Sequence, residues 1–354
     1  MSDPQKKKSS GKKVFAVIIL LIIVLAGAAF IGYRSGISAV SSSSEPVTVN
    51  IPAGSTASDV ITTLDEAGLI NNKLCAKAYV KLHSPDVIQA NTYMLDKNMD
   101  LDTIFDIISS GSGDYVIHTK LTIIEGSTVP QVAEDVASAA GISKDKVIAI
   151  WNEKAYLKEL ISEYWFLTDE ILADDIKYPL EGYLYPETYF VPGEDVTVES
   201  MTKQFLDMTD KKLSAIKDDM KTSKFSTHEL LTFASLVESE ANFDEDIPKI
   251  AGVFMNRLQK DMRLQCDSTV LYALGKKHID VTVNETTADS PYNTYKNKGL
   301  PPGPICATLA ETVEDCINYE HSDYLFFFAT EDGTVLYTKT YKEHQKVVKE
   351  NKWY

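Results

Sequence analysis

The chain has 354 residues, of which 44% are hydrophobic, and carries a formal net charge of −16. This hydrophobic content is that of a folded protein, and the length suffices for a membrane segment plus two or three modest domains. Beyond residue 34, 29 Lys and Arg stand against 50 Asp and Glu, a net charge of −21. A body this acidic is repelled by phosphate polymers, so the composition argues against nucleic acid as a partner.

Residues 14–33 form an uncharged apolar segment of the length that a helix needs to cross a bilayer. The sequence therefore predicts a cytoplasmic basic tail at 1–13, a transmembrane helix at 14–33 and a flexible linker at 34–46. Lysines cluster before the segment and only Arg34 follows it closely, which predicts a single-pass cell-membrane protein with an extracytoplasmic body. A cleavable signal peptide stays open as the alternative, because Ala26–Ala29 is a run of small residues.

Two stretches share the order strand, glycine turn, capped amphipathic helix and glycine stop. The first runs from Ile51 to Ile70 and the second from Ile124 to Ile142. They predict an α/β module at 47–117, and a second α/β module with connecting helices at 118–225. The alternative is that the likeness reflects only the common pattern of strand–turn–helix units.

A tyrosine-rich segment, LEGYLYPETYFVP, occupies residues 180–192. Tyrosines near carboxylates are typical of surfaces that bind sugar rings, whereas buried tyrosines would belong to a core. Both interpretations stay open.

The last block, residues 226–354, mixes helices with a β-hairpin whose turn is centred on Asp332-Gly333, so the fold class is predicted as α+β. A capping box at Ser226–Glu229 begins an amphipathic helix that runs past Glu238. A short helix with a glycine stop is expected at 267–275.

Glu238 is the candidate catalytic residue. It lies on the shoulder of the apolar stripe of its helix, where burial raises the pKa of a carboxylic acid and makes it a general acid near neutral pH. The plain alternative is a solvated glutamate. Glu240 is rotated about 200° from Glu238 around the helix, so the two cannot face one site. We interpret Glu240 as a structural or supporting residue.

Four motifs accompany this glutamate: ASLVESE at 234–240, VFMNRL at 253–258, MRLQCDSTV at 262–270, and SPYNTY at 290–295 followed by GLPPGPI. In these motifs the chain resembles the YceG-like (MltG) family of endolytic murein transglycosylases, over residues from about 47 to 354. Cys266 and Cys306 stand at motif positions as departures from the family pattern.

The resemblance implies a lytic transglycosylase, a lyase that cleaves the MurNAc–GlcNAc β-1,4 bond within nascent peptidoglycan strands and leaves 1,6-anhydro-MurNAc ends. Glu238 would be its acid/base, and a LysM-like region would precede the catalytic domain at 226–354. The implied partners are glycan strands, the membrane and cell-wall synthesis proteins. A non-catalytic wall-binding scaffold is the alternative.

Several polar residues of these motifs are candidates to line a glycan groove: Gln265, Asp267, Ser268, Asn293 and Tyr295. Asp267 could instead cap the short helix, and Asn293 could belong to a turn. Arg257 could orient a carboxylate, Glu238 included, or pair on a helix surface.

No cofactor or metal site is expected, because the histidines are scattered and no C-x-x-C pair is present. The four cysteines, Cys75, Cys266, Cys306 and Cys316, are too few for a disulfide framework. One disulfide among the last three stays open.

Overall fold

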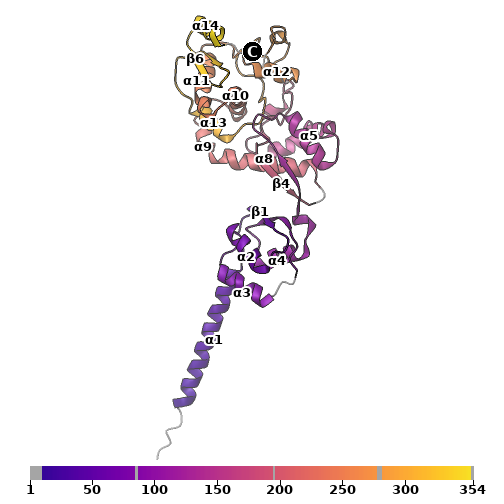
Figure 1. Cartoon of the computed structure of the whole chain (residues 1–354), viewed down its shortest axis with the longest axis vertical. Coiled ribbons are helices and arrows are strands. Elements are labelled where there is room, and N and C mark those ends of the chain that lie inside the picture. The colour runs from indigo at the N-terminus through magenta and orange to yellow at the C-terminus, as the bar shows by residue number, and fades with distance from the viewer. Residues whose placement is uncertain (1–9, 84–86, 194–195, 277–280, 352–354) are drawn as a thin grey trace, which may run out of the picture. The chain divides into compact units, whose positions relative to one another are not determined.

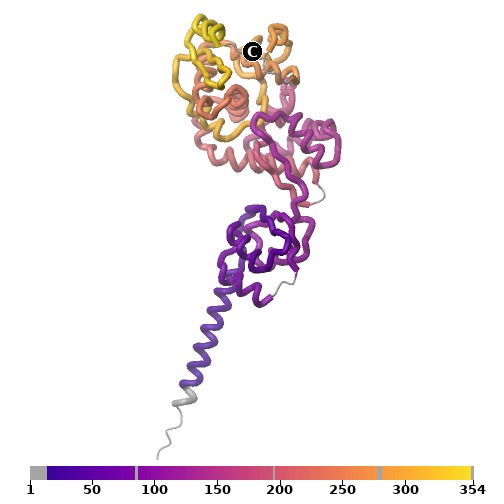
Figure 2. The backbone as a smooth tube through the Cα atoms, viewed as in Figure 1, coloured from indigo at the N-terminus to yellow at the C-terminus, as the bar shows by residue number. Residues whose placement is uncertain are grey.

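The computed structural model describes residues 10–83, 87–193, 196–276 and 281–351, with side chains from residue 14 onward (Figure 1). Two compact units are present, and each mixes helices with two-stranded sheets. The first contains the described residues up to 119 together with 190–193, and the second contains the rest. Figure 2 traces the backbone that connects them. Helices with small sheets agree with the predicted α+β class.

The first helix, α1, spans Ser10–Gly36 and includes the predicted segment 14–33. Its stretch from Val14 to Gly36 is long and apolar enough to cross a membrane. Residues 1–9 of the predicted basic tail lie outside the described residues.

The first unit has its own core beyond α1. Strand β1 (Pro46–Ile51) pairs antiparallel with β2 (Asn91–Asp96), so that Val49 lies opposite Tyr93. Three helices complete the unit: α2 (Ala57–Glu66), α3 (Lys73–His83) and α4 (Leu101–Ser110). Alternate strand residues and the apolar helix faces form one buried cluster, as the amphipathic patterns require.

The segment predicted to be a flexible linker, 34–46, is held against this unit. Ile37 is only 4% exposed and belongs to the core. The N–H of Leu101 donates to the Ile37 carbonyl, and the N–H of Ser41 donates to the Lys97 carbonyl. The Ser-rich composition suggests a tether, but these long-range bonds give the segment a defined path.

Both predicted strand–turn–helix units are present. The second consists of β3 (Ile117–Thr122) and α5 (Val129–Ala140). Capping boxes begin the two helices at Thr56 and Thr128. At Thr56 the bonds run both ways with Asp59, and at Thr128 the Gln131 side chain accepts the Thr128 N–H. Glycines with positive φ occupy equivalent places, Gly54 and Gly126 in the turns and Gly68 and Gly141 after the helices.

The chain after α5 is mainly helical. After α5 come α6 (Lys144–Trp151), α7 (Lys154–Glu163), β4 (Thr188–Pro192), α8 (Val198–Ala215) and α9 (Lys217–Met220). The C-terminal part contains α10 (Thr227–Glu240), α11 (Ile247–Gln259), α12 (Asp267–Leu274), α13 (Ala310–Ile317), β5 (Phe326–Ala329), β6 (Val335–Thr338) and α14 (Tyr341–Asn351). The predicted hairpin is confirmed as β5–β6, and α10 packs against α11, α12 and α13 (Figure 1).

The tyrosine-rich segment is core, and the interpretation as a sugar-binding surface is wrong. Glu181, Tyr183 and Tyr185 are 2%, 0% and 4% exposed. Each bonds to the start of a different helix. Glu181 Oε1 accepts the N–H of Val129 in α5 at 2.8 Å, and the Tyr183 hydroxyl lies 2.6 Å from Nδ1 of His228 in α10. The Tyr185 hydroxyl accepts the N–H of Ala310 in α13 at 3.2 Å.

We expect the buried carboxyl of Glu181 to make stability depend on pH. Burial raises its pKa from 4.5 to about 8 in the folded protein. The folded state therefore holds an extra proton between these values, and the free energy of unfolding falls as pH rises from about 4.5 to 8, by at most about 1.4 kcal/mol per pH unit.

Glu181→Gln should remove this fall, because the amide is neutral and its oxygen can still accept the Val129 N–H. Urea unfolding across pH 5–9 measures it. The exposed Glu187→Gln in the same segment serves as the control and should follow the parent chain. Parallel curves for the Glu181 variant and the parent would contradict the prediction.

Candidate active site

Glu238 lies in the last turn of α10, a helix that is buried along most of its length. The predicted capping box begins the helix: the Ser226 hydroxyl accepts the N–H of Glu229, and the Glu229 carboxylate accepts the N–H of Ser226. Residues 230–237 are all buried, so the helix is surrounded by neighbours rather than lying on a surface. This burial fixes the axis of α10 and with it the place of Glu238.

The carboxyl of Glu238 faces α13. Its Oε2 accepts a hydrogen bond of 2.6 Å from the hydroxyl of Thr312, and the backbone N–H of Leu309 also donates to the carboxyl. Thr312 is 1% exposed, whereas Glu238 is only partly buried. The carboxyl is thus held from its protein side by two donors.

Burial raises the pKa of Glu238 above its ordinary value of 4.5. The donors Thr312 and Leu309 oppose this rise because they stabilise the carboxylate, while the negative charges of Glu125 and Asp244 add to it. The result is a carboxyl with a raised pKa in a held orientation, as the sequence predicts for a general acid.

Two buried side chains of α10 fix the loop that precedes α13. His228 Nε2 lies 2.8 Å from the Pro302 carbonyl, which can only accept, so Nε2 carries the proton and Nδ1 accepts from Tyr183. The Ser235 hydroxyl accepts the N–H of Ile305 at 3.0 Å. These contacts hold the GLPPGPI segment along α10 and lead it to Thr312.

Gly303 allows this close approach. A Cβ at this position would come within 2.9 Å of Ile176 and 3.2 Å of the His228 ring. The absence of a side chain at position 303 therefore lets the loop pack closely against Ile176 and His228.

Glu240 faces a different element, as the angular argument predicts. Its Oε1 accepts from the Cys266 thiol at 2.9 Å and from the Ser268 hydroxyl at 3.1 Å. The Ser268 hydroxyl also accepts from Ser239, at 2.8 Å. Glu240 thus connects the end of α10 to the segment that begins α12. Burial raises the pKa of Glu240 above 4.5, and these two donors oppose the rise.

Four of the predicted groove residues lie near the end of α10: Gln265, Asp267, Ser268 and Tyr295. Gln265 is exposed, with a positive φ of 51°, and its N–H donates to the Thr294 carbonyl. Asp267 and Ser268 are partly exposed, and the hydroxyl of Tyr295 donates to Asp267 Oδ1. Cys266 rather than Asp267 occupies the N-cap position of α12. The Asp267 carboxylate instead accepts from the hydroxyl of Tyr295.

Asn293 lies apart from this surface. It is fully buried, its side-chain amide donates to the carbonyls of Thr286 and Ala288, and its Oδ1 accepts the N–H of Tyr295. The structure thus favours the turn interpretation, because no atom of the side chain is exposed to a ligand.

Arg257 bonds neither of the carboxylates. It is 7% exposed, and its guanidinium donates to the backbone carbonyls of Leu264 and Leu325, both at 2.6 Å. The surface pair is therefore wrong, and Arg257 orients no carboxylate, Glu238 included, by a hydrogen bond, although the charge of Glu240 acts on it. The residue instead ties the segment before α12 to β5.

The cysteines are free thiols, so the disulfide left open by the sequence is not formed. The Cys306 thiol lies 3.4 Å from the Ser235 carbonyl and donates to it.

Several residues that bear on Glu238 are not predicted by the sequence. Thr312 and Leu309 lie more than 70 positions downstream, and no local pattern connects them to Glu238. Ile124 and Phe243 are 60% and 50% exposed, and each directly precedes an acid whose charge reaches Glu238. Exposed apolar side chains beside a polar site are suited to the apolar faces of sugars.

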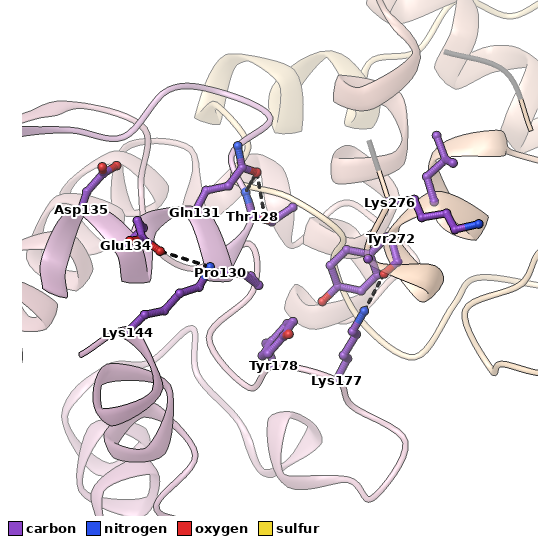
Figure 3. A pocket seen from close by; sticks show the side chains of 12 residues that line it. Thr128, Pro130, Gln131, Glu134, Asp135, Lys144, Lys177, Tyr178, Tyr272 and Lys276 are labelled. Atoms are coloured by element: carbon purple, nitrogen blue, oxygen red, sulfur yellow. Dashed lines mark hydrogen bonds and ion pairs between the residues drawn. The ribbon is translucent and has the colours of Figure 1, made fainter. Parts of the chain in front are cut away.

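A cavity of about 560 Å³ lies elsewhere in this unit (Figure 3). It is lined by the start of α5, by Lys177 and Tyr178, and by the end of α12 with Tyr272. Lys177 donates to the Tyr272 carbonyl at 2.6 Å and lies over the Tyr272 ring. Glu238 is not among the lining residues, so the cavity and the carboxyl are separate features.

Comparison with known proteins gives a consistent result. The YceG-like family matches residues 49–350 of the chain. The endolytic murein transglycosylase of Bacillus subtilis (strain 168) is 39% identical over 324 residues, which are 91% of this chain and 89% of that protein. The endolytic murein transglycosylase of Streptococcus pneumoniae (strain D39) is 34% identical over 347 residues; these cover 92% of this chain but only 63% of the longer streptococcal protein.

A solved structure is also similar. The crystal structure of the YceG-like protein lmo1499 from Listeria monocytogenes is 40% identical in sequence and has a TM-score of 0.62. The match covers 86% of this chain and all of that one.

We expect Thr312→Val to raise the pKa of Glu238. Valine has nearly the shape of threonine but cannot donate, so the carboxylate form loses one of its two stabilising bonds. The titration is followed by carbon-13 NMR of the glutamate side-chain carboxyl, assigned with a Glu238→Gln variant.

Thr232→Val is a matched control, since this buried hydroxyl bonds within its own helix to the His228 carbonyl. An unchanged or lowered pKa in the Thr312 variant would show that this bond does not control Glu238.

Proposed function

This chain belongs to the YceG-like family, and we propose that it is a membrane-anchored endolytic lytic transglycosylase of peptidoglycan with Glu238 as its acid/base. The proposed reaction cleaves the MurNAc–GlcNAc β-1,4 bond within a glycan strand. Its observational basis in this chain is the partly buried carboxyl of Glu238, with its raised pKa and its orientation by Thr312.

The proposed chemistry needs one carboxyl that changes its protonation state. Protonated Glu238 donates to the glycosidic oxygen as the bond to MurNAc C1 breaks. The resulting carboxylate then takes the proton of the C6 hydroxyl of the same sugar, whose oxygen bonds to C1. The products are a 1,6-anhydro-MurNAc end and a free GlcNAc end, and no water is consumed.

The surroundings of Glu238 suit both halves of this cycle. Burial favours the protonated form that begins the reaction, and Thr312 and Leu309 stabilise the carboxylate that completes it. Ordinary glycosidases need a second carboxyl as nucleophile or base. Glu240 is unsuited to that task because its carboxyl is engaged by Cys266 and Ser268 on another side of α10.

Gln265, Asp267, Ser268 and Tyr295 are proposed to contact the glycan, with Asn293 supporting their loop from within. Ile124 and Phe243 would add apolar surface. We also propose that the module at 47–117 is the LysM-like glycan-binding part and that 226–354 is the catalytic domain. The body would be extracytoplasmic, where it could meet cell-wall synthesis proteins.

The rival function is a scaffold that binds the wall without cleaving it. A raised pKa in a carboxyl held by two donors disfavours this alternative, because a scaffold needs no titratable group at that place.

Glu238→Gln should abolish cleavage, with a loss of about 10²–10⁴-fold in turnover, because the amide cannot transfer a proton. The assay is digestion of isolated peptidoglycan by the full chain, with mass spectrometry of the fragments. Glu229→Gln is the control on the same helix, since glutamine also completes a capping box and should leave activity unchanged.

The ends of the fragments separate the hypotheses. Anhydro ends that depend on Glu238 support the proposal. Reducing ends would show hydrolysis, with Glu125 or Asp244 as a base that activates water. If the parent chain leaves the glycan strands uncut, the scaffold function is favoured.

A further inference from the structure

The last turn of α1 is part of the first unit rather than a free stalk. Ile37, one residue past the helix, is buried in the core. Gly36 lies so close to α3 that a Cβ there would come within 2.4 Å of the Cys75 sulfur. The Cys75 thiol lies 3.9 Å from the Gly32 carbonyl. The first turn of α3 therefore packs on the final turn of α1, as Figure 1 also shows.

The length of α1 sets the depth of this contact in a membrane. The apolar stretch from Val14 to Gly36 has 23 residues. At about 1.5 Å per residue it is roughly 35 Å long, slightly more than the roughly 30 Å of a bilayer core. The turn from Gly32 to Gly36 then lies at the boundary between acyl chains and headgroups, and the start of α3 lies there with it.

The free face of α3 carries apolar side chains. Leu74 and Leu82 are 78% and 72% exposed, and Val87 beyond the helix is 51% exposed. Among the described residues of the first unit beyond α1, the other exposed large hydrophobic residue is Val40. Val40 follows Ala39, whose carbonyl accepts from Asn71 just before α3. The exposed apolar surface of this unit thus gathers around one helix.

The same face is basic, although the body of the chain is strongly acidic. Residues 73–83 include three lysines and no acid. Lys73 pairs with Asp65, but Lys77 and Lys81 are exposed and form no ion pair within the described residues. Positions 74, 77 and 81 fall on one side of a helix, so both lysines flank Leu74. Leucines with flanking lysines are suited to an anionic lipid surface.

We propose that the exposed face of α3 lies on the membrane surface and binds anionic phospholipid headgroups. Leu74 and Leu82 enter the boundary of the acyl chains, while Lys77 and Lys81 contact lipid phosphates. This inference rests on the proposed membrane anchoring by α1. It adds a second, lateral contact that limits how the first unit can tilt on its anchor.

The test uses the full chain in bilayers whose lipids carry bromine near the top of the acyl chains. Tryptophan at the membrane boundary is quenched by bromine. Leu74→Trp adds fluorescence to that of the parent chain. In brominated bilayers that contain phosphatidylglycerol, this added fluorescence should be quenched. Leu82→Trp provides a second site in case the first variant folds poorly.

Ala53→Trp is the matched control. Ala53 is exposed in the turn before α2, whereas the other end of α2 is tied to α3 by the pair Asp65–Lys73. The length of α2, about 15 Å, separates Ala53 from this pair and from Leu74 beside it. Its added fluorescence should persist.

Charge reversal tests the headgroup contact. Lys77→Glu with Lys81→Glu should weaken quenching of Trp at position 74 in phosphatidylglycerol and leave it little changed in phosphatidylcholine. Lys154→Glu with Lys158→Glu makes the same change at the same spacing on exposed positions of α7 and should have no effect.

The outcomes separate the two hypotheses. Failure of the parent chain to float with the vesicles overturns the anchoring and this inference with it. Flotation with equal fluorescence loss at positions 53, 74 and 82 overturns the contact of α3 alone. Unchanged quenching at position 74 after Lys77→Glu with Lys81→Glu overturns the binding of anionic headgroups.

Discussion

The second unit depends on one buried strip of alternating residues, Glu181, Tyr183 and Tyr185. Each of these side chains bonds to the beginning of a helix, in α5, α10 and α13 respectively. Helix starts carry backbone donors without partners in the helix, and Glu181 and Tyr185 accept such donors, which stabilises the starts of α5 and α13. Tyr183 holds the start of α10 through the side chain of His228 instead. Because α10 carries Glu238 and α13 carries Thr312, two members of the strip set the distance across which acid and donor meet. Their burial therefore bears on the proposed chemistry although none of them contacts the reacting carboxyl.

The end of α10 is held on two sides by different chemistry. On one side Glu238 meets Thr312 and Leu309 and stays partly open to solvent. On the other, Glu240 accepts from Cys266 and Ser268 and connects the helix to the loop that carries the candidate glycan contacts. Glu238 is thereby available for the proposed proton transfer, whereas Glu240 holds the loop before α12 against α10. The division follows from helical geometry, since two residues along a helix lie on nearly opposite sides.

In the first unit, the end of α1 is built into the core. A helix suited to cross a membrane ends inside the core of a small α/β module, through Ile37 and the close contact of Gly36 with Cys75. Under the proposed anchoring by α1, such a junction would transmit the orientation of the membrane to the module. A flexible tether would lose that orientation.

Local structure could be predicted from the sequence alone: the capped helix of Glu238, the repeated strand–turn–helix units and the hairpin at Gly333. These depend on neighbours within a few positions, and the residues alone suffice to predict them. The sequence also placed Glu238 on the shoulder of an apolar stripe and separated it from Glu240. The distant groups that these side chains contact are known only from the packed fold. Thr312 bonds Glu238 across 74 positions, Arg257 bonds backbone carbonyls instead of a carboxylate, and the tyrosines of 180–192 point inward. Such contacts depend on how whole helices pack, and no periodicity along the chain encodes that packing.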